Sequence, residues 1–313
     1  MNPLVIIVGP TAVGKTALGV DLARTINGEI ISVDSVQVYK YLNIGSAKPT
    51  IAEQQNVPHH LIDFLEPDQL YSAAQFQNEA NSLINNVRER NHIPIVLGGT
   101  GLYARSLLDP YDFSEYSPGH LRKKWTDFLR KNGKEALFEK LTKLDPLSAE
   151  RLHINDTVRV IRALEVFELT GKTLSSQRQP ENNYQPLDNS IIYIGLTAPR
   201  EILYKRINLR CEQMISEGLL EETQQILQKG YSPKLKPMRS IGYRHAVWYL
   251  YGFVTLNEML RLLKRDTRHF AKRQLTWFLR DPRITWYDIT QISNENIVEE
   301  LSLTCEAIKT RVE

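Results

Sequence analysis

The stretch "LVIIVGPTAVGKT", from Leu4 to Thr16, predicts the centre of the fold. Its first five residues are apolar and mostly β-branched, which is typical of a strand buried on both faces of a parallel sheet. A glycine-rich turn follows and matches the pattern G-x-x-x-x-G-K-[ST]. A helix is expected directly after it, ending at Asn27-Gly28. A strand, a glycine-rich loop and a helix in this order predict a P-loop-type α/β fold.

This loop has the chemistry of an anion site. Its glycines let backbone N–H groups point inward at a phosphate, and the following helix adds its positive N-terminal end. The lysine supplies a mobile cation, and the threonine hydroxyl supplies a ligand for Mg²⁺. The predicted loop consists of Gly9, Pro10, Thr11, Ala12, Val13, Gly14, Lys15 and Thr16, with Thr16 as the metal ligand.

The rest of the chain alternates strands and helices around one long helical stretch. Strands are expected at 29–35, 93–98, 191–196 and 283–287, and helices at 15–26, 72–90, 199–229, 239–280 and 292–311, while 39–70 reads as irregular. Residues 117–179 have helical periodicity alone. We predict a doubly wound parallel sheet with C-terminal helices (1–110 and 186–313) that carries a helical insertion domain (111–185).

Composition favours a globular protein with a polyanionic partner. The 313 residues are 42% hydrophobic and carry a net charge of +3. That charge is uneven, at −3 over 1–110 and +5 over each of 118–180 and 255–283. Basic stretches beside a phosphate loop suggest a polyanion, although each stretch alone also fits a solvated surface. Two cysteines without a CxxC pair and a short apolar N-terminus predict a cytoplasmic protein that does not enter a membrane. A monomer is expected, although the sequence carries no signal for the oligomeric state.

Asp34 is the acidic residue that stands out. It closes the second predicted strand, "EIISVDS", and strand ends beside a P-loop face the ligand crevice. A carboxylate there can take a proton or hold a metal-bound water, but Asp-Ser also fits a turn or a helix cap. Nucleotide hydrolases usually hold the metal through an aspartate on a neighbouring strand. Here the third strand ends at Gly98-Gly99 instead, so the hydrolase pattern lacks a part unless that acid stands on another strand.

Several longer blocks carry a resemblance to a known family. These are "GPTAVGKT", "SVDSVQVYKYLNIGSAKP", "PHHLIDFLEP", "LGGTGLY" and "SIGYRHAVWYL". Together they resemble the bacterial tRNA dimethylallyltransferases, and the resemblance spans nearly the whole chain. It implies transfer of the dimethylallyl group of dimethylallyl pyrophosphate to N6 of the adenine 3′ of the anticodon, with pyrophosphate leaving. The P-loop would then hold that pyrophosphate with Mg²⁺, and whether ATP also binds it stays open.

The resemblance also implies roles for single residues. The catalytic ones would be Asp34 as general base, with Lys15, Thr16 and Arg210 around the leaving pyrophosphate. Without the family pattern, Arg210 reads as a solvated helix arginine and Thr100 as a helix N-cap. The acceptor would be the anticodon stem-loop of tRNA. Its implied contacts are Asp34, Ser35, Val36, Gln37, Thr100, Arg122, Lys123, Val158, Arg159, Arg162, Arg239, Gly242, Arg244, Arg265 and Arg268.

Three other functions remain open on sequence alone. A P-loop kinase would transfer phosphate from ATP and need no RNA, which leaves the basic stretches unused. A non-catalytic RNA-binding protein would have no use for the lysine, threonine and aspartate of the loop region. An adenylate prenyltransferase would use the same donor with a free nucleotide, whereas the long helical insertion favours a macromolecular acceptor.

Overall fold

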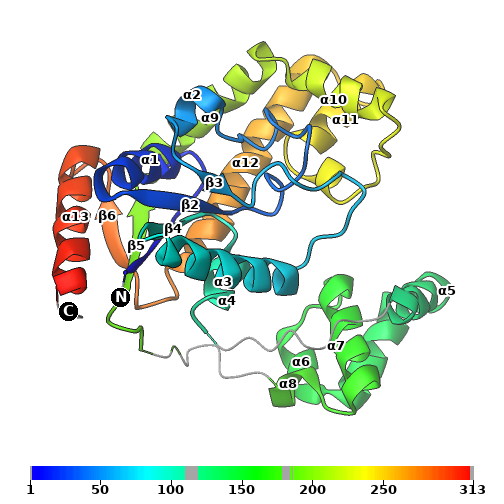
Figure 1. Ribbon diagram of the computed structural model, residues 1–313. Helices are drawn as coiled ribbons and strands as arrows, with labels where there is room; N and C mark the ends of the chain where they lie inside the picture. The colour runs from blue at the N-terminus through cyan, green and yellow to red at the C-terminus, as the bar shows by residue number, and fades with distance from the viewer. Residues whose placement is uncertain (1, 110–118, 178–183, 185, 311–313) are drawn as a thin grey trace. The chain divides into compact units, whose positions relative to one another are not determined.

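A computed structural model describes residues 2–109, 119–177, 184 and 186–310, and in them six parallel strands form one sheet (Figure 1). The strand order is β3-β2-β4-β1-β5-β6. The strands are β1 (Leu4–Val8), β2 (Gly28–Val33), β3 (His59–His60), β4 (Ile93–Gly98), β5 (Ile191–Thr197) and β6 (Thr285–Asp288). The predicted doubly wound parallel sheet is confirmed. The short β3, at the sheet's edge, was not expected from the irregular stretch 39–70, because two histidines carry no strand pattern.

Helices cover both faces of this sheet. α1 (Lys15–Ile26) packs on β1, β2 and β4, and α13 (Asn294–Thr310) packs on α1. α3 (Ala73–Glu89) and α4 (Gly101–Ser106) lie on the other face, as right-handed crossovers in this strand order require. α3 begins at the cap expected from the sequence, where Ser72 and Gln75 form a capping box. The short α2 (Ile51–Gln54) follows the long loop after β2.

The C-terminal region is helical as predicted, with more breaks. The segment 199–229 forms α9 (Arg200–Ser216) and α10 (Leu219–Gln228), which separate at Gly218, where φ is 102°. The segment 239–280 forms α11 (Tyr243–Leu250) and α12 (Leu256–Phe278), after a 3₁₀ turn at Pro237–Arg239. Gly252, with φ 75°, lies between these two helices. Left-handed glycines end helices, which explains the extra breaks.

The chain divides into two compact units, Met1–Pro110 with Gln185–Glu313, and Tyr111–Tyr184. The predicted junctions lie beside or among residues 110–118 and 178–185, which apart from Tyr184 are outside the described ranges. The second unit contains α5 (Gly119–Leu144, broken at Gly133), α6 (Pro146–Arg151), α7 (Thr157–Thr170) and α8 (Leu174–Gln177). Its own apolar core is built around Leu137, Leu141 and Leu164.

The register of the sheet brings three loops to one edge. Val8 of β1 pairs with Gly98 of β4 on one side and with Gly195 of β5 on the other, and Val33 of β2 also pairs with Gly98. Since parallel strands end on the same side, the segments after β1, β2 and β4 leave the sheet together. Within the described ranges, no helix has the length and apolar character needed to cross a membrane.

Candidate active site

The loop after β1 is shaped by its two glycines. Gly9 has φ 146° and Gly14 has φ 107°, both in the region that side chains disfavour. A Cβ on Gly9 would lie 2.6 Å from the carbonyl oxygen of Leu196, so the loop passes directly over the end of β5. α1 begins at Lys15, immediately after Gly14, and its N-terminal N–H groups face the loop. The geometry is that of an anion cradle.

Lys15 is held inside the cradle. Its Nζ donates a hydrogen bond of 2.8 Å to the carbonyl oxygen of Pro10. Burial, together with the neighbouring Arg210, lowers the pKa of Lys15 from its usual value near 10.5 to about 7, although Asp34 opposes part of the shift. The buried site therefore stabilises the charged form of Lys15 only weakly, and a bound anion would stabilise it further.

Asp34 follows β2 and has one oxygen anchored and one open. Its Oδ1 accepts hydrogen bonds from the backbone N–H groups of Val36 (2.8 Å) and Gln37 (3.2 Å). Oδ2 accepts no hydrogen bond from the residues that the structure describes. Burial raises the pKa of Asp34, and the two N–H groups and Lys15 partly offset that rise. Asp34 is thus a turn residue, as the alternative interpretation had it, and its second oxygen is left open.

The turn after β4 lies beside Asp34. Val33, the residue before Asp34, uses its carbonyl oxygen to accept hydrogen bonds from the N–H groups of Gly99 (3.3 Å) and Thr100 (3.2 Å). Thr100 occupies the N-cap position of α4, but its side chain makes no capping hydrogen bond. A Cβ on Gly98 would lie 2.3 Å from the oxygen of Val33, which explains why no acidic residue stands at the end of this strand.

α9 brings two arginines to the cradle. Arg210 is partly buried, influences the pKa of Lys15, and makes no hydrogen bond within the described residues. Burial lowers the pKa of Arg210 as well. Arg206, one helical turn earlier, donates from Nη1 to the carbonyl oxygen of Val13 at 3.3 Å. The sequence analysis missed Arg206, although its i, i+4 spacing from Arg210 places both on one face of α9.

Gln37 is engaged within the protein. Its Nε2 donates to the carbonyl oxygens of Ser46 (3.2 Å) and Ala47 (3.0 Å), and its Oε1 accepts from the Ser32 hydroxyl at 3.2 Å. The neighbouring Ser35 and Val36 are partly exposed. An adenine edge that pairs with the Gln37 amide would have to replace these bonds.

Two residues of α12 near the loops were not selected from the sequence. Gln274 is buried and contacts both the P-loop and the β4 turn. Trp277 is 37% exposed and lies against the backbone of Gly101, where a Cβ would come within 2.2 Å of the indole ring. A polar residue on the buried stripe of an amphipathic helix is the signal that could have identified Gln274, because such residues need partners.

The predicted RNA contacts of the first unit are partly neutralised. Asp266 accepts hydrogen bonds from Arg244 (2.5 Å) and Arg265 (2.8 Å), and these partners hold the pKa of Asp266 at about 2. Arg268 donates to Asn208 at 2.7 Å and lies over the ring of Tyr204. The structure also places Arg239 on the surface and Gly242, with φ 96°, at the start of α11.

In the second unit, the predicted contacts differ in their availability. Arg122 forms a two-point ion pair with the fully buried Glu165 at 2.5 and 2.8 Å, and it therefore contributes to the packing of α5 on α7. Arg159 pairs with Asp156 at 3.2 Å while staying 70% exposed. The other three are Lys123 and Val158, both exposed, and Arg162, which is partly buried.

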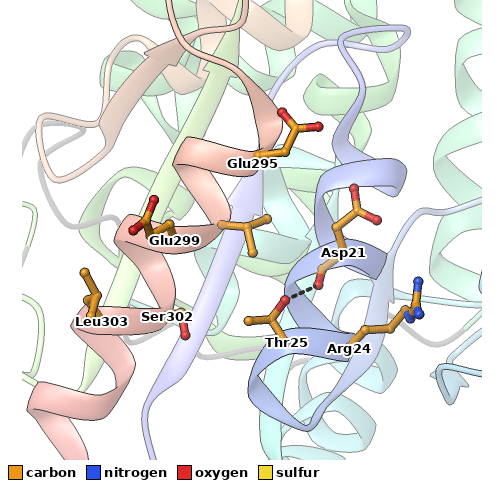
Figure 2. A pocket seen from close by; sticks show the side chains of 8 residues that line it. Asp21, Arg24, Thr25, Glu295, Glu299, Ser302 and Leu303 are labelled. Atoms are coloured by element: carbon orange, nitrogen blue, oxygen red, sulfur yellow. Dashed lines mark hydrogen bonds between the residues drawn. The ribbon is translucent and has the colours of Figure 1, made fainter.

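A shallow groove between α1 and α13 lies away from this site (Figure 2). Asp21, Arg24 and Thr25 line it from α1, and Figure 2 shows the Thr25 hydroxyl bonded to the Asp21 carbonyl oxygen at 2.9 Å. At a rise of 1.5 Å per residue, Asp21 lies about 9 Å along α1 from Lys15. The groove does not contain the loop, Asp34 or Arg210.

A P-loop with Lys15 and Arg210 beside a carboxylate with one open oxygen is typical of P-loop enzymes that act on a phosphorylated ligand. The family model described as IPP transferase matches residues 37–281. The chain is 62% identical to the tRNA dimethylallyltransferase of Desulfitobacterium hafniense (strain DSM 10664 / DCB-2), over the full length of both, and 51% identical to that of Carboxydothermus hydrogenoformans, over 95% of this chain and 96% of the relative. The chain belongs to this family of enzymes, the tRNA dimethylallyltransferases.

Solved structures agree with this assignment. The tRNA isopentenylpyrophosphate transferase of Bacillus halodurans is 40% identical with a TM-score of 0.73, and each chain is covered completely. A eukaryotic dimethylallyltransferase whose structure was determined acting on tRNA is 30% identical with a TM-score of 0.77, over 92% of this chain and 74% of that one.

Proposed function

We propose that this chain transfers the dimethylallyl group of dimethylallyl pyrophosphate to N6 of the adenine 3′ of the anticodon in tRNA. The observation that carries the proposal is the pairing of a cationic cradle, Lys15 with Arg210, and the open Oδ2 of Asp34 at one edge of the sheet. One part suits an anionic leaving group, and the other suits a nucleophile that must lose a proton.

The donor half of the reaction needs stabilisation of negative charge. As the allylic C–O bond breaks, its electron pair stays on pyrophosphate, and the charge there grows. The N-terminus of α1, Lys15 and Arg210 are fixed cations and dipoles that meet this charge without reorganising. Because burial lowers the pKa values of Lys15 and Arg210, both gain when an anion enters. Arg206, already bonded to the loop, adds positive charge on the same side.

A Mg²⁺ ion fits the loop as part of this proposal. Mg²⁺ is commonly bound through one or two protein oxygens together with substrate phosphates and water. The hydroxyl of Thr16 makes no hydrogen bond within the described residues and would be the protein ligand of this ion. Bound there, Mg²⁺ would supply further positive charge for the pyrophosphate oxygens.

The acceptor half needs a base beside the donor. The adenine N6 attacks the allylic carbon, a C–N bond forms, and the proton leaving N6 passes to Oδ2 of Asp34. The raised pKa of Asp34 makes the carboxylate a stronger base than an exposed aspartate. Because the target base is stacked in the anticodon loop, it has to be turned out of the stack to reach Asp34. Thr100, whose hydroxyl does not cap α4, would contact the base once it is turned out.

Binding of the tRNA stem-loop would use basic residues in both units. We assign the helical insertion, residues 111–185, and the basic face of α12 to phosphate contacts. Arg159 and Lys123 are exposed in the insertion, whereas Arg122 would contribute mainly through the packing of α5 on α7. Arg265 is exposed on α12 and shares Asp266 with Arg244.

An incorporation assay tests the proposal. Radiolabelled dimethylallyl pyrophosphate, Mg²⁺ and unmodified tRNA are mixed with the protein, and AMP and ATP replace tRNA in parallel tubes. Label in tRNA alone is the expected result, with nuclease digestion placing it on one adenosine. Label in AMP or ATP would instead support a free-nucleotide prenyltransferase. Phosphate transfer from labelled ATP without any prenyl transfer would support the kinase alternative.

A further inference from the structure

Gln274 connects the two loops of the candidate active site. It lies on the buried stripe of α12 between Ala271 and Phe278 and is 7% exposed. Its Oε1 accepts a hydrogen bond of 2.8 Å from the backbone N–H of Thr11 in the P-loop. Its Nε2 donates a hydrogen bond of 3.0 Å to the carbonyl oxygen of Gly99 after β4. The amide therefore uses one end on each loop.

The P-loop peptide that Gln274 contacts is held from both sides. The carbonyl oxygen of Pro10 accepts from Lys15, and the N–H of the same peptide unit, which belongs to Thr11, donates to Gln274. A peptide unit is planar, so fixing both groups fixes its orientation. The position of the Lys15 ammonium is thus linked to the position of the Gln274 amide.

The other end of the amide leads to the base. The N–H of Gly99 donates to the carbonyl oxygen of Val33, the residue directly before Asp34. Gly99 also packs closely on Gln274, because a Cβ there would lie 2.2 Å from Nε2. A continuous series of hydrogen bonds therefore runs from Lys15 through Gln274 to the residue before Asp34.

We propose that Gln274 is a positioning residue that sets the spacing between the donor cradle and Asp34. The inference rests on the proposed function, since it concerns how donor and acceptor are held for one group transfer. Both polar groups of the Gln274 amide bond to the backbone, so the residue acts through Thr11 and Gly99. Reacting atoms must approach within about 3.5 Å, and a misplacement of about 1 Å costs roughly 10²-fold in rate.

The first test compares two matched substitutions. Gln274→Met keeps the length of the side chain and removes both hydrogen bonds. Gln77→Met is the control, because Gln77 is a partly buried glutamine in the same unit and donates one hydrogen bond to a backbone oxygen, that of Ser106. Single-turnover rates are measured with saturating labelled dimethylallyl pyrophosphate and unmodified tRNA, alongside the tRNA dissociation constant and the unfolding midpoint.

The expected result separates rate from binding. Gln274→Met should lower the single-turnover rate by about 10- to 100-fold, with tRNA affinity unchanged and Gln77→Met close to wild type. A rate equal to that of the control would overturn the inference. So would a loss confined to tRNA affinity, or a lower unfolding midpoint with a normal rate.

A second variant tests the role of Gln274 through the pH dependence of the rate, which a purely structural role would leave unchanged. In Gln274→Glu, the ionised carboxylate can still accept from Thr11 but cannot donate to Gly99, whereas the protonated carboxyl can do both. The ratio of its rate to the wild-type rate should therefore rise as the pH falls from 8 to 5.5. A ratio independent of pH contradicts the proposal, even if Gln274→Met fails to fold. Wild-type protein without tRNA labelling would refute the proposed function itself, which keeps the two failures distinct.

Discussion

The lowered pKa of Lys15 predicts that donor binding depends strongly on pH. In the ligand-free protein its pKa is about 7, because of burial and the nearby Arg210. A pyrophosphate in the cradle should restore the pKa toward its usual value of 10.5 or above. The donor then binds more tightly to the protein with a protonated Lys15. Donor affinity is therefore highest below pH 7 and falls as the pH rises through that value.

The size of the effect follows from the shift. Between pH 7.5 and 9.5 the free protein loses its Lys15 proton while the complex keeps it, which weakens binding roughly 80-fold, or about 2.6 kcal/mol. The donor contributes little there, since the last pKa of a phosphate ester is near 6. Isothermal titration calorimetry with dimethylallyl pyrophosphate, in the absence of tRNA, gives the dissociation constants. Titrations in two buffers of different ionisation enthalpy also give the proton uptake.

Lys15→Arg is the matched control, because an arginine does not titrate in this range. Its donor affinity should be nearly constant between pH 7.5 and 9.5. A wild-type affinity that is equally constant would show that Lys15 is fully charged in the free protein. Equal slopes in both proteins would assign the titration to another group. Either result refutes the reasoning from burial.

Three further predictions concern the base, the tRNA surface and the fold. Asp34→Asn removes the proton acceptor while keeping the backbone hydrogen bonds of the turn. The single-turnover rate of tRNA labelling should therefore fall by about 10²- to 10⁴-fold. A large loss of tRNA affinity with a normal rate would argue against Asp34 as the base. Replacing Arg265 and Arg268 with Ala should make the slope of log K for tRNA binding against log salt concentration shallower by about 1.4. The control substitution Arg24→Ala on α1 should leave that slope unchanged. If filter binding gives the wild-type slope for the double variant, this face of α12 does not contact tRNA. Arg283→Met leaves the buried Asp281 without its arginine and, among the described residues, leaves Asp109 with Arg105 alone, since Arg283 contacts both carboxylates at 2.7 Å. The free energy of unfolding in urea should fall by about 3 kcal/mol; a change near zero would mean that desolvation cancels the attraction within the cluster.

Much of the core could be predicted because its signals are local. The apolar strand Leu4–Val8, the glycine pattern of the loop and the Ser72 cap each depend on neighbours in sequence. The sequence did not reveal the extra helix breaks at Gly218 and Gly252, because a glycine in a helical pattern can either continue the helix or end it. The sequence did not predict β3, because this strand is two residues long and forms only by pairing with β2.

The sequence by itself determined the phosphate loop, the alternation of strands and helices, and Asp34 at the end of a strand. These follow from backbone conformation and from hydrophobic period, which a chain carries locally. Only the tertiary structure decided that one oxygen of Asp34 is anchored and the other open, and that burial beside Arg210 depresses the pKa of Lys15. It also brought Gln274 to Thr11 across 263 residues. Contacts at that separation depend on how whole elements pack, so no local pattern encodes them.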